Sequence, residues 1–81
     1  MSRKDILNTA IKVWCEGASH GNTDLPINDL LEDIAGSKYL MAEVSDDPII
    51  DTFHNLTNAE LRRYIKEGNM ILYRNGLEVV K

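Results

Sequence analysis

The chain has 81 residues, of which 43% are hydrophobic and 27% are charged, and its formal net charge is −4. We expect one domain over residues 1–81, because this length suits a single domain and this composition is typical of globular rather than disordered proteins. No apolar run approaches the roughly 18 residues that cross a bilayer, and no apolar segment follows the basic start of the chain, so we expect neither a membrane span nor a signal peptide.

Residues 2–16 are predicted to form the first helix. Ser2 is the expected N-cap, and Gly17 is expected to end the helix. The apolar side chains recur at helical spacing and form one stripe (Ile6, Leu7, Ala10, Ile11 and Trp14). Residues 17–25 are rich in glycine and small polar residues, which predicts a loop.

Residues 26–35 are predicted to form a second helix, with Asp24 as its cap and Pro26 in its first turn. Its apolar residues follow the spacing i, i+3, i+4, i+7 of a buried helix face (Ile27, Leu30, Leu31 and Ile34). The acidic residues lie off this stripe and are expected to face solvent (Asp29, Glu32 and Asp33). Gly36 is expected to end the helix.

Residues 38–44 fit a short strand and a further helical turn equally well. Their alternation is poor, and their Leu, Met, Ala and Glu residues favour helix. Residues 46–54 are predicted to form a short third helix. Pro48 lies near its start, and the preceding Asp46 and Asp47 suit the positive end of a helix dipole. Three apolar residues of this helix are expected to point inward (Ile49, Ile50 and Phe53).

Residues 57–67 carry the clearest local signal, a T-x-x-E capping box made by Thr57 and Glu60. Leu56 and Leu61 are placed on either side of the cap for a hydrophobic staple. We therefore predict a fourth helix here, with one buried stripe (Leu61, Tyr64 and Ile65).

Gly68 is expected to stop that helix, and the period then changes. Two short apolar runs over residues 70–80 flank Asn75 and Gly76, a dipeptide that suits the type I′ turn of a β-hairpin. The competing interpretation extends the helix through Tyr73. The glycine inside such a helix and the β-branched residues after the turn count against it, so we predict a hairpin.

The predicted fold is mainly α (α+β): a small domain of about four helices with a C-terminal β-hairpin. The predicted core combines the apolar stripes of the helices (Ile6, Leu7, Ile11, Trp14, Leu30, Leu31, Ile34, Ile50, Phe53, Leu61 and Ile65). The order of these elements resembles the winged-helix class. That resemblance implies a recognition helix at 57–67 and a wing at 70–80.

Charge is unevenly distributed. Residues 1–58 contain ten acidic and four basic residues, whereas residues 59–81 contain three acidic and five basic ones. An acidic face of this kind can bind a basic protein surface by electrostatic steering. We therefore expect a protein partner and assign its contact to acidic residues and one tyrosine (Asp29, Glu32, Asp33, Asp46, Asp47 and Tyr39). The simpler alternative is that these acids are solvated helix faces and dipole partners.

The alternative function is a winged-helix DNA-binding regulator. Its nucleic-acid contacts would be basic residues of the last third of the chain (Arg62, Arg63, Lys66 and Arg74). Five basic residues are few for a DNA-binding domain, and the middle of the presumed recognition helix lacks Asn, Gln and Ser to read base edges. We therefore rank DNA binding second.

No catalytic residue, metal ligand or cofactor is assigned. The only cysteine, Cys15, falls beside an apolar stripe and is expected to be buried, and neither His20 nor His54 has the spacing of a zinc site with it. We therefore expect a non-enzymatic protein, and the unpaired cysteine favours the cytoplasm. A small acidic chain without catalytic motifs resembles the accessory proteins of phages and mobile elements, which implies a regulatory role. A homodimer through the edge of the hairpin is a further alternative.

Overall fold

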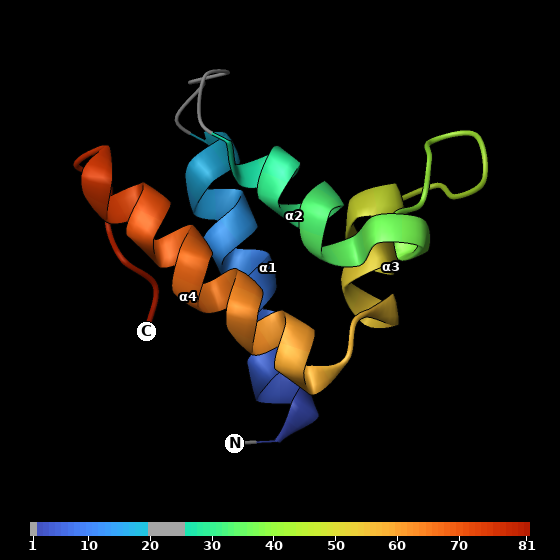
Figure 1. Cartoon of the computed structure of the whole chain (residues 1–81), viewed down its shortest axis with the longest axis horizontal. Helices are drawn as coiled ribbons and strands as arrows, with labels where there is room; N and C mark the ends of the chain where they lie inside the picture. Colours follow the sequence, from blue (N-terminus) through green and yellow to red (C-terminus); the bar gives the residue numbers. More distant parts are fainter. Residues whose placement is uncertain (1, 20–25) are drawn as a thin grey trace.

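The computed structural model describes residues 2–19 and 26–81, and the described residues form four α-helices and one 3-10 helix. In chain order these are α1 (Arg3–Ser19), α2 (Ile27–Ala35), η1 (Gly36–Lys38), α3 (Pro48–Asn55) and α4 (Asn58–Arg74). The two long helices, α1 and α4, pack together and run in the same general direction (Figure 1). Helix α2 packs across α4, and α3 packs against α1.

Tyr64 of α4 lies at the centre of the core and is fully buried. Its ring packs edge-on against Phe53 of α3, with the ring centroids 5.0 Å apart. Its hydroxyl donates a hydrogen bond of 3.3 Å to the carbonyl oxygen of Ile27 in α2. Burial raises the pKa of the Tyr64 phenol well above its usual range, so the hydroxyl keeps its proton and remains a donor.

The helix stripes predicted much of the core. Six of the expected residues are buried (Ile6, Leu7, Leu31, Ile34, Phe53 and Leu61), whereas Ile50 is half-buried. Four more pack against the edge of the core (Ile11, Trp14, Leu30 and Ile65). Val13 and Leu72 are also fully buried and were missed. Leu72 was missed because it was assigned to a strand.

The predicted C-terminal β-hairpin is wrong, because the described residues contain no strand and α4 continues from Asn58 to Arg74. Gly68, the expected stop signal, lies inside the helix and is buried. A Cβ atom on this residue would lie 2.5 Å from Cγ1 of Val13 in α1. The glycine therefore allows two helices to approach each other closely, and it does not end α4.

Asn75 and Gly76 end α4 instead of turning a hairpin. Gly76 has φ +72°, but Asn75 has φ −101°, whereas a type I′ turn requires positive φ at both residues. The N–H of Gly76 donates to the carbonyl of Tyr73 at 3.1 Å, and the N–H of Leu77 donates to the carbonyl of Leu72 at 2.9 Å. This is the Schellman pattern of a helix C-terminus. Without a hairpin there is no wing, and the predicted winged-helix arrangement is overturned.

Residues 77–81 turn back beside α4 without forming a strand (Figure 1). The side chain of Asn69 bonds both main-chain groups of Val80: its Nδ2 donates to the carbonyl at 2.8 Å, and its Oδ1 accepts from the N–H at 2.9 Å. Leu77 and Val80 pack against the edge of the core. Residues 77–81 therefore cover one edge of the helical core instead of forming a hairpin strand.

Helix α1 also continues past its expected stop. Gly17 is buried, and a Cβ there would lie 2.6 Å from Cγ1 of Ile27, so this glycine too serves a close approach. Residues 20–25, which include most of the expected loop and the proposed cap Asp24, lie outside the described residues. Gly36 follows the end of α2 as predicted and has φ +56°.

Residues 38–44 form no strand: Lys38 ends η1, and the N–H of Val44 donates to the carbonyl of Met41 at 3.0 Å in a single turn. The segment between η1 and α3 is held to α3 by the buried Thr52, whose hydroxyl accepts a hydrogen bond from the N–H of Leu40 at 3.0 Å and donates one to the carbonyl of Pro48. Helix α3 begins at Pro48, two residues after the predicted start at 46, and Asp47 is its N-cap, accepting from the N–H of Ile50 at 3.2 Å. Among the described residues, no helix has the length and apolar character to cross a membrane.

Candidate functional site

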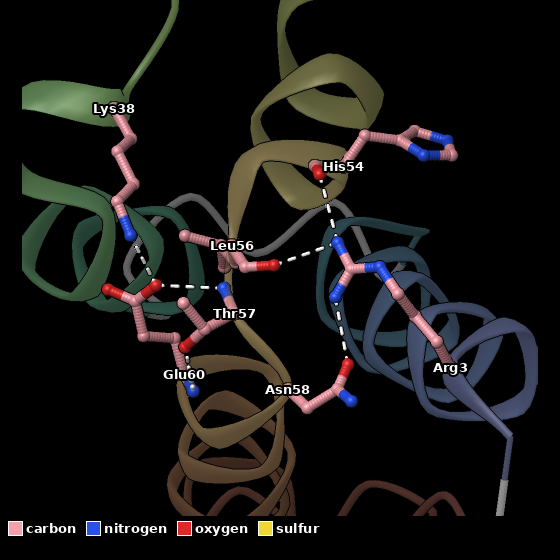
Figure 2. A network of polar contacts seen from close by, with 7 residues as sticks. All are labelled: Arg3, Lys38, His54, Leu56, Thr57, Asn58 and Glu60. Carbon is pink, nitrogen blue, oxygen red and sulfur yellow. Dashed lines mark hydrogen bonds and ion pairs between the residues drawn. The ribbon is translucent and has the colours of Figure 1, made fainter.

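The first turn of α4 is fixed by the predicted capping box, which is confirmed. The N–H of Glu60 donates to Oγ1 of Thr57 at 3.1 Å, and Oε1 of Glu60 accepts from the N–H of Thr57 at 2.8 Å. The same Oε1 accepts from Nζ of Lys38 in η1 at 2.6 Å (Figure 2). The hydrogen bond from Lys38, together with that from the Thr57 backbone, lowers the pKa of Glu60 from 4.5 to about 2.

Arg3 of α1 holds the other side of the same turn (Figure 2). Its Nη1 donates to Oδ1 of Asn58 at 2.8 Å. Its Nη2 donates to the carbonyl oxygens of His54 at 2.9 Å and Leu56 at 2.8 Å. One guanidinium thus ties α1 to the end of α3 and the start of α4. These contacts and the capping box set the direction of α4, and hence the side chains that its outer face exposes.

The second half of α4 exposes large apolar side chains. Met70 is 46% exposed and Tyr73 is 76% exposed. Together with Lys66 they follow the helical spacing i, i+4, i+7, so the three side chains lie along one face. Arg74 is exposed beside them.

Two hollows open to solvent lie along this face of α4. The first, of about 260 Å³, is lined by residues of α4 alone (Lys66, Asn69, Met70, Tyr73 and Arg74). The second, of about 230 Å³, also reaches α2 (Leu30, Glu67, Met70, Ile71 and Arg74). Because the hollows share Met70 and Arg74, they form one continuous surface, which we call the α4 surface.

The four basic residues predicted to bind nucleic acid do not form one uniform patch. Arg63 is engaged by acids: its Nε lies 2.6 Å from Oε2 of Glu67, and its Nη2 lies 3.6 Å from Oδ2 of Asp33 in α2. Arg62, Lys66 and Arg74 form no ion pair within the described part of the chain. Two of these three, Lys66 and Arg74, line the α4 surface.

The acidic residues predicted to bind protein lie in two places. Asp29, Glu32 and Asp33 are exposed on α2, and the ion pair of Asp33 with Arg63 places this helix face next to α4. Asp46 and Asp47 are exposed in the segment before α3, where Asp47 also caps that helix. In Figure 1 this segment lies on the opposite side of the molecule from the C-terminal half of α4.

Tyr39, the aromatic residue predicted to bind protein, is half-buried at the edge of the core. Its hydroxyl accepts a hydrogen bond of 3.3 Å from Nδ2 of Asn28. Oδ1 of the same asparagine accepts one of 3.4 Å from Nε1 of Trp14. Tyr39 therefore takes part in a polar chain that joins α1, α2 and the segment after η1, and the residue is only partly buried.

Sequence reasoning missed the α4 surface as a unit. Met70 and Ile71 were assigned to a strand, and Leu30 was placed in the core. The helical spacing of Lys66, Met70 and Tyr73 was the available signal, but the glycine between the first two outweighed it.

No group of three or more His, Cys, Asp and Glu side chains that could hold a metal ion occurs among residues 2–19 and 26–81. Cys15 is exposed, although its position beside the α1 stripe predicted burial. His20 lies outside the described residues, and His54 is exposed at the end of α3.

No protein-family model, no curated protein and no solved structure matches this chain. The α4 surface and the acidic face of α2 are therefore the features of the molecule that bear on its function.

Proposed function

We propose that this chain is a non-catalytic regulatory protein that binds another protein through the α4 surface and the adjoining acidic face of α2. The observation that carries this proposal is the exposure of Met70 and Tyr73 beside two hollows on a rigidly held helix. Aromatic, methionine and arginine side chains are enriched in protein interfaces, and anchor residues occur where a partner can fill a pocket.

The acidic face of α2 extends the proposed interface. Asp29 and Glu32 are exposed and form no ion pair within the described residues, so their charges remain available to a partner. Like charges in a row steer an oppositely charged surface during encounter. The partner would therefore place an apolar segment on the α4 surface and a basic region beside α2.

Nucleic-acid binding by α4 is the second candidate. Arg62, Lys66 and Arg74 support it, because no acidic side chain of the described residues neutralises them. The pairing of Arg63 with Glu67 and Asp33 counts against it, as does the net charge of −4. Any nucleic-acid contact would have to be made by α4 without a wing.

The test is capture of partners by the tagged full chain from a lysate treated with nuclease. We expect one stoichiometric protein, which Met70→Glu should no longer retain because the new carboxylate lies in the interface. Met41→Glu is the matched control: Met41 is 58% exposed in the segment before α3 and lines neither hollow of the α4 surface. Circular dichroism must show that both variants remain folded.

The acidic edge is tested separately by Asp29→Lys combined with Glu32→Lys, which leaves the Asp33–Arg63 pair intact. We expect weaker capture and a slower association rate. If all variants retain the partner as the wild type does, protein binding through these two faces is wrong. If every captured protein disappears with nuclease, nucleic-acid binding replaces it.

A further inference from the structure

The charges around the α4 surface are not balanced. The hollow of about 260 Å³ is lined by Lys66 and Arg74 and by no acidic residue. Glu67 lines the second hollow, but it is engaged by Arg63, which also pairs with Asp33 of α2. The two cations that flank Met70 therefore remain uncompensated within the described residues, and anionic groups such as carboxylates would complement them.

The spacing of the two cations restricts how those carboxylates are presented. Lys66 and Arg74 are eight residues apart on one helix, which is about 12 Å along its axis, with Met70 midway. A partner helix lying along α4 places residues i and i+7 on one face about 10.5 Å apart. Residues i+3 and i+4 of that helix lie between them and would face Met70 and Tyr73.

We infer that the segment bound on the α4 surface is an amphipathic helix of a partner protein, with two carboxylates two turns apart and apolar side chains between them. In one-letter form its pattern is E-x-x-L-L-x-x-E. This inference rests on the proposed function and adds the chemistry of the partner. The carboxylates bind Lys66 and Arg74, and the apolar side chains fill the hollows over Met70.

A second copy of this chain fits the same surface less well. In a two-fold dimer with its axis at Met70, antiparallel α4 helices would place Lys66 of one copy next to Arg74 of the other, which is a like-charge contact. A single nucleic-acid strand would match the two cations and could stack on Tyr73, but it would leave the apolar side chains of Leu30 and Ile71 uncovered. An acidic, apolar helix satisfies both features.

The experiment measures fluorescence anisotropy of two labelled alanine-rich peptides with the full chain. One peptide carries E-x-x-L-L-x-x-E, and the matched peptide carries lysine in place of both glutamates. We expect the glutamate peptide to bind about tenfold more tightly, the range that two exposed ion pairs provide over two like-charge contacts. The preference should weaken at high salt.

Charge reversal on the protein makes the test specific. Lys66→Glu combined with Arg74→Glu should invert the preference, so that the lysine peptide binds more tightly. Lys4→Glu combined with Lys12→Glu is the matched control, because these lysines are exposed on α1 and line neither hollow; it should leave the preference unchanged. Met70→Glu should weaken binding of the glutamate peptide.

Three outcomes would overturn the inference: neither peptide binds, both bind equally, or the reversal leaves the preference unchanged. Competition by a single-stranded oligonucleotide without peptide selectivity would identify nucleic acid as the occupant. A concentration-dependent dimer that Met70→Glu dissolves would identify a second copy. If the peptides fail but Met70→Glu still abolishes capture of a protein, the proposed function stands and only the chemistry of the partner segment is wrong.

Discussion

Gly68 and Val13 lie so close together that a Cβ atom on residue 68 would stand 2.5 Å from Cγ1 of Val13. Val13 is fully buried, and its branched side chain is stiff at χ1, so it has little room to move away. This contact sets the distance between α1 and α4. It also allows α4 to continue to Arg74 and to present the α4 surface.

Replacing Gly68 with alanine should lower the free energy of unfolding by about 1–3 kcal/mol, because overpacking outweighs the gain in helix propensity. Urea denaturation followed by circular dichroism measures this change. Combining Gly68→Ala with Val13→Ala should recover part of the loss, since the second change removes the clashing methyl group. A stabilising effect of Gly68→Ala alone would contradict the close packing of α1 and α4.

The two residues after α4 should respond differently to substitution. Gly76→Ala should cost about 1–2 kcal/mol, because only glycine adopts its positive φ without strain. Asn75→Ala should cost less, since Asn75 has negative φ and loses only the 2.8 Å hydrogen bond from its Nδ2 to the carbonyl of Ile71. Thermal unfolding of both variants distinguishes the cases. Equal and large losses would instead favour a type I′ turn.

The interaction of Lys38 with Glu60 should make stability depend on acid pH. Because folding lowers the pKa of Glu60 from 4.5 to about 2, its contribution is complete above about pH 4.5 and is lost as the pH falls towards 2. Urea denaturation from pH 2 to pH 6 should show less acid destabilisation in Glu60→Gln than in the wild type. Lys38→Met should also reduce the dependence. An identical pH profile in all three proteins would exclude the lowered pKa.

Arg3 should stabilise the fold more through the geometry of its guanidinium than through its charge. Arg3→Ala removes three hydrogen bonds to Asn58, His54 and Leu56 and should destabilise the fold by about 1 kcal/mol or more. Arg3→Lys keeps the charge but cannot reproduce the fork, so it should recover little of that loss. Chemical denaturation gives both values. Full recovery by lysine would show that a simple charge effect holds the turn.

The features that were predicted correctly from the sequence are determined by residues close together in the chain. The capping box of Thr57 and Glu60 and the end of α2 before Gly36 each depend on residues a few positions apart, and both are found as predicted. The start of α3 at Pro48 lies within two residues of the prediction. The apolar stripes likewise predicted most of the buried residues, because helical periodicity is a property of a single segment. Which helix each buried stripe packs against is determined by the tertiary structure.

The errors concern residues whose role depends on a distant neighbour. From the local sequence alone, Gly68 is expected to end a helix. In the fold it packs against Val13, where only a glycine is small enough for the contact. Asn75 and Gly76 favoured a hairpin in sequence, but they also suit a helix terminus, and the continuation of α4 to Arg74 gives them that second role. The candidate site was missed for the same reason, since Met70 and Tyr73 share an exposed face only when α4 continues.

The sequence alone determined that this chain is one small, mainly helical domain, where three of its helices begin or end, and which stripes face inward. These features follow from hydrogen bonds and side-chain periodicity within single segments. The tertiary structure decided the length of α4, the conformation of the C-terminal residues and the position of Lys66 and Arg74 on either side of Met70. Close packing between α1 and α4 determines these features. The small size of Gly68 matters only when α1 packs against α4 at this position, and the sequence of one segment does not show that contact.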